Sequence, residues 1–310
     1  MNFRSNTAAT TQPVGLSGLG TRVSSLTLPL IFVALYGSGF VGAKYGLPYS
    51  PPLTFLVLRF AIASVLIVLL AMLVRAKWPG SLREILHIAV AGLLTVGMFS
   101  AGVFVAISVG LSPALSALII ALQPILVAVI ARRVLGEQLV WRQWLGLAMG
   151  LVGVAFVVWY KIDFGTFQLF GVAMSFVGLL GLTFGNLYQK RYCANMSVFP
   201  GGAIQSAASA LVLLPLALLF ERMEVVWHPE FVIALAYMSV GVSIGALSLL
   251  YIMIRRGNVS RVASVFYLVP VSAAIASYVL YGEVFDANVV FGVSVVAVGV
   301  YLVNSSPRGE

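Results

Sequence analysis

Residues 111–157 read LSPALSALIIALQPILVAVIARRVLGEQLVWRQWLGLAMGLVGVAFV, and a weaker copy of this stretch lies near the C-terminus. Each copy has an apolar segment with an internal proline, then a Gly-Glu corner, then a glycine-rich apolar segment. A shift of 146 positions aligns Ala117 with Ala263, Pro124 with Pro270, Ala128 with Ala274, Gly136-Glu137 with Gly282-Glu283, Gly146 with Gly292, and Gly153 with Gly299. Composition alone does not produce so specific a match, so the chain is an internal duplication.

The composition indicates an integral membrane protein. Apolar residues make up 61% of the chain, charged residues only 9%, and the mean hydropathy is +1.07. In a soluble protein, about a quarter of the residues are charged. The 47 residues between Glu84 and Arg132 carry no charge. As one helix this run would be about 70 Å long, more than twice a hydrocarbon core of about 30 Å. It therefore consists of two spans, with a turn at residues 108–113.

The remaining apolar runs complete an all-α membrane fold of ten transmembrane helices. Proline-containing turns separate several of the runs, as at Ser50-Pro51-Pro52, where proline is tolerated at a helix start. The predicted spans are 27–47, 52–74, 86–107, 112–131, 139–158, 166–189, 199–220, 231–254, 260–281 and 286–304. We expect residues 1–25 and 304–310 to be polar tails, the first of them a tail before a span and not a cleaved signal peptide.

The distribution of the net charge of +9 predicts the topology. Counted from a cytoplasmic N-terminus, fourteen cations fall on one side: Arg4, Arg22, Arg75, Lys77, Arg83, Arg132, Arg133, Arg142, Lys190, Arg191, Arg255, Arg256, Arg261 and Arg308. Only Lys161 and Arg222 fall on the other. The positive-inside rule therefore makes both termini cytoplasmic. The charge is thus a topology signal, and we do not expect nucleic acid as a partner.

An offset of five spans means that the second copy enters the membrane from the opposite face. The sequence therefore predicts two inverted five-helix repeats, residues 26–161 and 164–303. Halves related by an axis in the membrane plane are typical of transporters, because each half can rock against the other around a site at the midplane.

With its proline helix, Gly-Glu corner and glycine-rich last helix in each half, the chain resembles the EamA-type branch of the drug/metabolite transporter (DMT) superfamily over residues 26–303. The opening Tyr36-Gly37-Ser38-Gly39-Phe40 and the pattern Pro52…Arg59 are most similar to the YddG-type exporters of aromatic amino acids. The resemblance implies a multi-pass protein of the cell inner (plasma) membrane. It also implies outward movement of phenylalanine, tryptophan, tyrosine and other hydrophobic amino acids.

Catalysis is not expected. Gly241-Val242-Ser243-Ile244-Gly245 matches the spacing of a nucleophile elbow. That motif requires a strand-turn-helix context, whereas here it lies in the middle of a predicted helix. The single cysteine, Cys193, rules out an intrachain disulfide and a multi-cysteine metal site. We expect no cofactor, no metal and no catalytic residue, and we expect a monomer whose partners are the lipid bilayer and a small-molecule substrate.

Two cations and two prolines within the predicted spans are candidate functional residues. Arg59 lies about 10 Å inside its span, where it must face the bundle or water. It either ties helix ends together or meets a substrate carboxylate. Lys44 can reach the headgroups by snorkelling. Pro124 and Pro270 interrupt matched helices, so they are either static kinks or hinges. Glu137 and Glu283, at the two corners, are the other candidates for hinge or gating residues.

The predicted interior is neutral and partly aromatic. Candidate substrate-binding residues are Tyr36, Phe99, Gln123, Asn186, Tyr188, Gln205, Ser243, Ser264 and Tyr267. No Asp or Glu lies in the middle of a predicted span, which argues against a cationic-drug pump and against a carboxylate proton relay. Aromatic rings with amide groups suit an amphipathic zwitterion. A nucleotide sugar or a drug-like compound remains an alternative substrate, and a membrane enzyme or a scaffold remains an alternative class.

Overall fold

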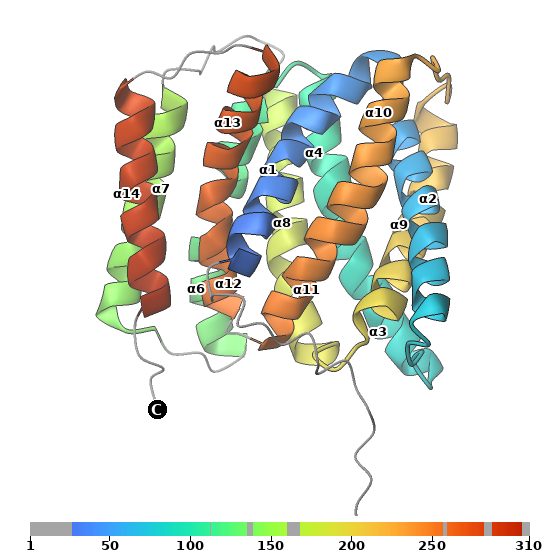
Figure 1. The fold of residues 1–310 in the computed structure, drawn as a ribbon, viewed down its shortest axis with the longest axis horizontal. Helices are drawn as coiled ribbons and strands as arrows, with labels where there is room; N and C mark the ends of the chain where they lie inside the picture. Colours follow the sequence, from blue (N-terminus) through green and yellow to red (C-terminus); the bar gives the residue numbers. More distant parts are fainter. Residues whose placement is uncertain are drawn as a thin grey trace, which may run out of the picture.

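The computed structural model describes residues 27–111, 113–134, 139–159, 168–256, 259–281 and 287–305. Helices make up most of these residues (Figure 1). In chain order they are α1 (Thr27–Gly46), α2 (Pro52–Leu73), α3 (Leu82–Gly92), α4 (Phe99–Ser108), α5 (Pro113–Ile120), α6 (Gln123–Val134), α7 (Trp141–Trp159), α8 (Gln168–Tyr192), α9 (Val198–Phe220), α10 (Pro229–Tyr237), α11 (Leu247–Arg256), α12 (Val259–Ser264), α13 (Val269–Tyr281) and α14 (Ala287–Ser305).

Helices occur in each of the ten predicted ranges, with boundaries that differ by a few residues. Within the described ranges, six helical stretches are long and apolar enough to cross a membrane: Thr27–Tyr49, Pro52–Leu73, Leu82–Ser108, Leu169–Tyr192, Val198–Phe220 and Pro229–Arg256. The all-helical membrane class is thus confirmed, and the count of ten spans and their inversion stay predictions.

Local sequence explains where several helices begin. Pro52 and Pro229 occupy the first turn of α2 and α10, where their missing N–H costs no hydrogen bond. At α3 the Ser81 hydroxyl accepts a hydrogen bond from the Glu84 amide at 3.2 Å, and the Glu84 carboxylate accepts one from the Gly80 amide at 3.0 Å. This arrangement closely resembles a capping box and satisfies donors that the helix itself leaves free.

Two helix pairs lie at opposite sides of the bundle. On one side α7 packs along α14, and on the other α2 packs along α9 (Figure 1). The first contact depends on glycine, because a Cβ at Gly146 would lie 2.6 Å from the Gly299 carbonyl oxygen, and a Cβ at Gly153 would lie 2.7 Å from that of Gly292. Small residues let the two backbones approach closely without a hydrophobic driving force between helices.

Several other contacts between helices have counterparts when the two halves of the chain are exchanged. The contact of α8 with the segment Leu93–Met98, between α3 and α4, has its counterpart in the contact of α1 with the segment Met238–Ala246, between α10 and α11. Likewise, the packing of α5 and α6 against α8 corresponds to that of α13 against α1, and the contact of Leu93–Met98 with α9 corresponds to that of Met238–Ala246 with α2. Corresponding elements of the two halves therefore contact corresponding neighbours.

Matched interruptions also occur in both halves. A π-helical segment, Leu93–Met98, joins α3 to α4, and a second one, Met238–Ala246, joins α10 to α11. The helix that carries Pro124 breaks between α5 and α6 just before that proline. A 3₁₀ segment, Val265–Leu268, precedes Pro270 in the same way. The irregular backbone is thus concentrated in the third and fourth helical stretches of each half.

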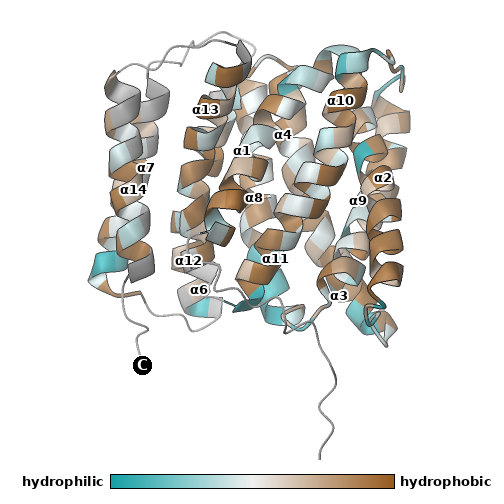
Figure 2. Cartoon of the chain, in the orientation of Figure 1, coloured by the Kyte–Doolittle hydropathy of each residue, from teal (hydrophilic) through white to brown (hydrophobic). Residues whose placement is uncertain are grey.

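The two ends of the bundle differ in charge. At the acidic end, defined by Glu221 and Glu230, the Glu221 carboxylate accepts hydrogen bonds from the amides of Leu53 and Thr54 at 2.8 and 2.7 Å, and the Tyr49 hydroxyl donates to Glu230. The basic end carries Lys77, Arg191, Arg255 and Arg256. Figure 2 shows hydrophilic residues at the lower ends of α3, α6 and α11, and mostly hydrophobic residues along α2.

Candidate functional site

A small cavity lies in the interior where α1, α2, α4 and α11 meet the two π segments. Its volume is about 30 Å³, enough for about one or two water molecules. The lining residues are Tyr36, Gly39, Phe40, Arg59, Thr95, Val96, Phe99, Ser100, Val103, Phe104, Met238, Val242 and Leu247. Both π segments contribute to this wall, which agrees with the frequent occurrence of such segments at functional sites.

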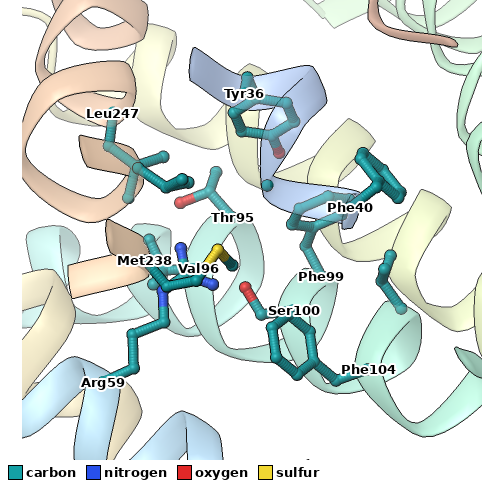
Figure 3. A pocket seen from close by; sticks show the side chains of 13 residues that line it. Tyr36, Phe40, Arg59, Thr95, Val96, Phe99, Ser100, Phe104, Met238 and Leu247 are labelled. Carbon is teal, nitrogen blue, oxygen red and sulfur yellow. The ribbon is translucent and has the colours of Figure 1, made fainter. Parts of the chain in front are cut away.

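Among the described residues, Arg59 is the only charged one on the cavity wall. Its side chain is 4% exposed, and its Nε donates a hydrogen bond to the Ser243 hydroxyl at 2.9 Å. The guanidinium carbon lies 5.1 Å from the ring centre of Phe60 and 5.9 Å from that of Phe104. Figure 3 shows the guanidinium end pointing into the space between Met238 and Ser100.

Within the described ranges, neutral groups, and not an anion, offset the electrostatic cost of this arginine. Placing it within a membrane costs about 2.5–3.5 kcal/mol on insertion scales. Each cation–π contact returns about 0.5–2 kcal/mol, and the charge-assisted hydrogen bond to Ser243 adds about 1.5–3 kcal/mol. In the described part of the chain, no Asp or Glu side chain pairs with Arg59. A positive charge therefore remains uncompensated at the cavity.

Aromatic rings surround the rest of the cavity. The rings of Tyr36 and Phe99 stack with centres 5.8 Å apart, and Tyr36 also meets Phe32 and Phe266 at 5.0 and 5.3 Å. The buried hydroxyl of Tyr36 has no hydrogen-bond partner among the described residues, and it points into the cavity (Figure 3). The Ser100 hydroxyl also makes no hydrogen bond to that part of the chain, and Thr95 donates to the Ala91 carbonyl at 2.8 Å.

The structure thus brings three of the residues predicted from the sequence into one place. Tyr36, Phe99 and Arg59 lie on the wall, and Ser243 contacts Arg59 directly. Lys44 lies apart from them, exposed in the last turn of α1. The cavity offers a cation and two unpaired hydroxyls inside an aromatic shell, a set that can bind a carboxylate and an apolar ring together.

The other predicted substrate-binding residues lie outside this cavity. Gln123 is fully buried at the start of α6, and neither amide atom has a partner among the described residues. On α8 the Asn186 carbonyl is buried and unpaired in the same sense, while Gln205 donates to the Gln189 side chain at 3.1 Å. Ser264 is buried at the end of α12. These residues are inward-facing in this conformation, but the helices pack over them.

Two predicted tyrosines have packing partners instead. The Tyr188 hydroxyl lies 2.7 Å from His87 Nδ1, on the surface between α3 and α8. The Tyr267 ring packs on α7, where a Cβ at Gly150 would lie 2.4 Å from it. Neither residue reaches the cavity, because each ring is held by a neighbouring helix.

Of the predicted hinges, the structure describes the prolines alone. Pro124 and Pro270 lie directly after the interruptions in their helices. Next to the second one, α1 approaches very closely, because a Cβ at Gly37 would lie 2.9 Å from the Val269 carbonyl oxygen. Glu137 and Glu283 lie outside the described residues.

The sequence did not single out Phe40, Thr95, Ser100 and Phe104 as site residues. Phe40 stands in the Tyr36–Phe40 opening that carries the family resemblance, which was an available signal. Thr95 and Ser100 are small hydroxyl residues in an otherwise apolar run, and such residues more often serve helix packing.

The model of the EamA-like transporter family matches the chain twice, at residues 24–159 and 169–305. The chain is 25% identical over 289 residues to a Bacillus subtilis protein described as "Uncharacterized transporter YvbV", with 90% of each chain covered. It is 24% identical over 283 residues to the "Uncharacterized inner membrane transporter YedA" of Escherichia coli strain K12, with 88% of this chain and 90% of that protein covered.

A further relative is a "Probable amino-acid metabolite efflux pump" of Salmonella typhimurium, 24% identical over 287 residues, with 89% and 93% of the two chains covered. One crystal structure superposes on the chain with a TM-score of 0.74 at 18% identity, covering 90% of this chain and 95% of that one. At this identity the superposition shows a shared fold.

Proposed function

The chain belongs to the EamA-like transporter family, and on this premise we propose that it is an alternating-access exporter or exchanger of small amphipathic metabolites, with aromatic amino acids among its substrates. The relatives named as transporters and efflux pumps place it among multi-pass inner-membrane transporters.

The cavity at Arg59 is the observation that carries the substrate proposal. A guanidinium with free N–H groups can bind a carboxylate in a bidentate manner. The stacked rings of Tyr36 and Phe99 offer an apolar face to a substrate ring. A substrate that carries both a carboxylate and an aromatic ring would contact both the guanidinium and the aromatic part of the wall. This differs from the neutral amide site expected from the sequence, because the carboxylate now meets a cation.

Transport requires the cavity to change size. A volume of about 30 Å³ is far below the 300–1,000 Å³ typical of ligand pockets, so the cavity in the described state is too narrow to hold an aromatic amino acid. Widening needs helices that bend, and the matched interruptions before Pro124 and Pro270 are suitable positions. The correspondence of helix contacts between the halves supports the inverted repeat, and an inverted pair supplies two equivalent gates.

The name of the Salmonella relative refers to amino-acid metabolites, which agrees with this substrate class. Within the described spans, no carboxylate lies at mid-membrane depth, so we propose transport without a carboxylate proton relay. A nucleotide sugar or a drug-like compound is the alternative cargo.

Counterflow in proteoliposomes tests the proposal. Vesicles loaded with unlabelled phenylalanine should accumulate labelled phenylalanine transiently, and vesicles without protein should not. The variant Phe99→Ala removes the ring that stacks on Tyr36 and should lower the initial rate severalfold. The substrate proposal would be overturned if the vesicles exchange no aromatic amino acid but do exchange a nucleotide sugar or an organic cation.

A further inference from the structure

The charges on the cavity wall bear on the charge of the substrate that it can bind. The inference drawn from them rests on the proposed transport function. The polar groups on the cavity wall come from three parts of the fold. The π segment Leu93–Met98 and α4 contribute the hydroxyls of Thr95 and Ser100, α1 contributes Tyr36, and α2 contributes Arg59. The segment Met238–Ala246 and α11 contribute apolar side chains.

None of these groups can balance a substrate ammonium. Among the described residues the wall carries no Asp or Glu. The Thr95 hydroxyl donates to the Ala91 carbonyl at 2.8 Å, and like the hydroxyls of Tyr36 and Ser100 it offers an ammonium only a neutral oxygen as acceptor. Arg59, in contrast, uses its Nε on Ser243 and keeps its two terminal nitrogens without a partner in the described part of the chain.

The charge balance therefore depends on the ligand. An aromatic monocarboxylate would make the occupied cavity neutral. A zwitterion would leave one positive charge, because its ammonium has no counter-ion, and an aromatic amine would leave two. Buried charge that is not paired is strongly unfavourable.

We infer that the site selects monoanionic aromatic carboxylates that lack an amino group, such as aromatic 2-oxo acids, over the corresponding amino acids. Phenylalanine is then a weaker substrate of the same site, accepted through its ring and carboxylate. Tyr36 and Ser100 hydroxyls can donate hydrogen bonds to the same carboxylate or to a neighbouring carbonyl oxygen of the ligand.

Equilibrium binding measured by calorimetry on the purified full chain tests this selection with three matched probes. Phenylpyruvate carries one negative charge, phenylalanine is a zwitterion, and phenylalanine amide is a cation with the same ring. We expect phenylpyruvate to bind at least about tenfold more tightly than phenylalanine, and the amide not to bind. Phenylalanine that binds as tightly as phenylpyruvate, or more tightly, would refute the selection.

Arg59→Gln tests the origin of the preference. It should reduce the ratio of phenylpyruvate to phenylalanine affinity to less than about twofold. Lys44→Gln removes a positive charge at the exposed end of α1 and should leave the ratio unchanged. A ratio that survives in Arg59→Gln would also overturn the inference, and the ranking on the unmodified protein decides by itself should that variant not fold.

The two proposals fail in different ways. If phenylalanine is exchanged in proteoliposomes without a preference for phenylpyruvate in binding, only the selection of monoanions is wrong. If none of the three probes binds and none is exchanged, the proposed function is wrong as well.

Discussion

Tyr36→Phe should affect stability and transport in opposite directions. The hydroxyl is buried, points into the cavity, and has no partner among the described residues. An unsatisfied buried hydroxyl costs about 1–3 kcal/mol, and a water in the cavity would reduce this cost toward zero. Removing the hydroxyl should therefore leave the protein as stable as before or more stable, with a rise in Tm of about 2 °C for each kcal/mol gained.

The same change should weaken transport, because the bound substrate loses one hydrogen bond. Such a bond to a charged group is worth about 1.5–3 kcal/mol, which corresponds to roughly tenfold or more in affinity. Thermal unfolding in detergent and phenylalanine counterflow measure the two effects on one preparation.

Tyr251→Phe is the matched control for this experiment. Tyr251 is also buried, its hydroxyl is also unpaired among the described residues, and it does not line the cavity. It should show the same stability change with normal exchange. If Tyr36→Phe lowers Tm by several degrees and leaves exchange intact, the hydroxyl has a structural partner and the reasoning fails.

Four further predictions concern the scaffold and the topology. Glu221→Gln should lower the free energy of unfolding by about 1–2 kcal/mol, because the carboxylate accepts charge-assisted hydrogen bonds at the start of α2; Glu224→Gln, on an exposed neighbour, should not change Tm. Gly299→Ala should destabilise the α7–α14 contact by about 1–3 kcal/mol, since the new Cβ would lie 2.6 Å from the Gly146 carbonyl oxygen, whereas Gly80→Ala enters open space and should have no such effect on thermal unfolding. Burial raises the pKa of the Cys193 thiol to about 11, so maleimide labelling should be slow at neutral pH and accelerate as the pH approaches that value. The contribution of this thiol to stability should be lost as the pH rises above 9.0, the ordinary pKa of a cysteine thiol. Ser108→Cys in a Cys193→Ser background should label readily and, if both termini are cytoplasmic, from the side opposite to Ala76→Cys.

The sequence predicted the helical elements well, because the signals are local and strong. The charge-free run between Glu84 and Arg132 required a turn, and α4 ends at Ser108 as expected. The π segments escaped prediction, since one extra residue in a turn does not disturb an apolar run in which nearly every position is hydrophobic.

The site was predicted in part. Arg59 stood out because a charge inside a span must face the interior, and Tyr36 belonged to a distinctive opening motif. Gln123, Asn186 and Gln205 are inward-facing too, but whether a polar side chain lines a cavity or is covered by a neighbouring helix depends on the packing of distant segments and on the conformational state. Sequence periodicity identifies a face without identifying what lies against it.

The paired π segments also bear on the history of the gene. A π turn contains one residue more than the α turn it replaces, so it corresponds to a single-codon insertion. Leu93–Met98, shifted by the 146 positions that align the two halves, falls within Met238–Ala246. Because the same register places both irregular turns and both proline helices, one insertion in an ancestor of half the length accounts for the pair. The ancestor then carried its cavity-forming turn before duplication, and under the proposed inverted repeat two copies of that small protein would have assembled in opposite orientations.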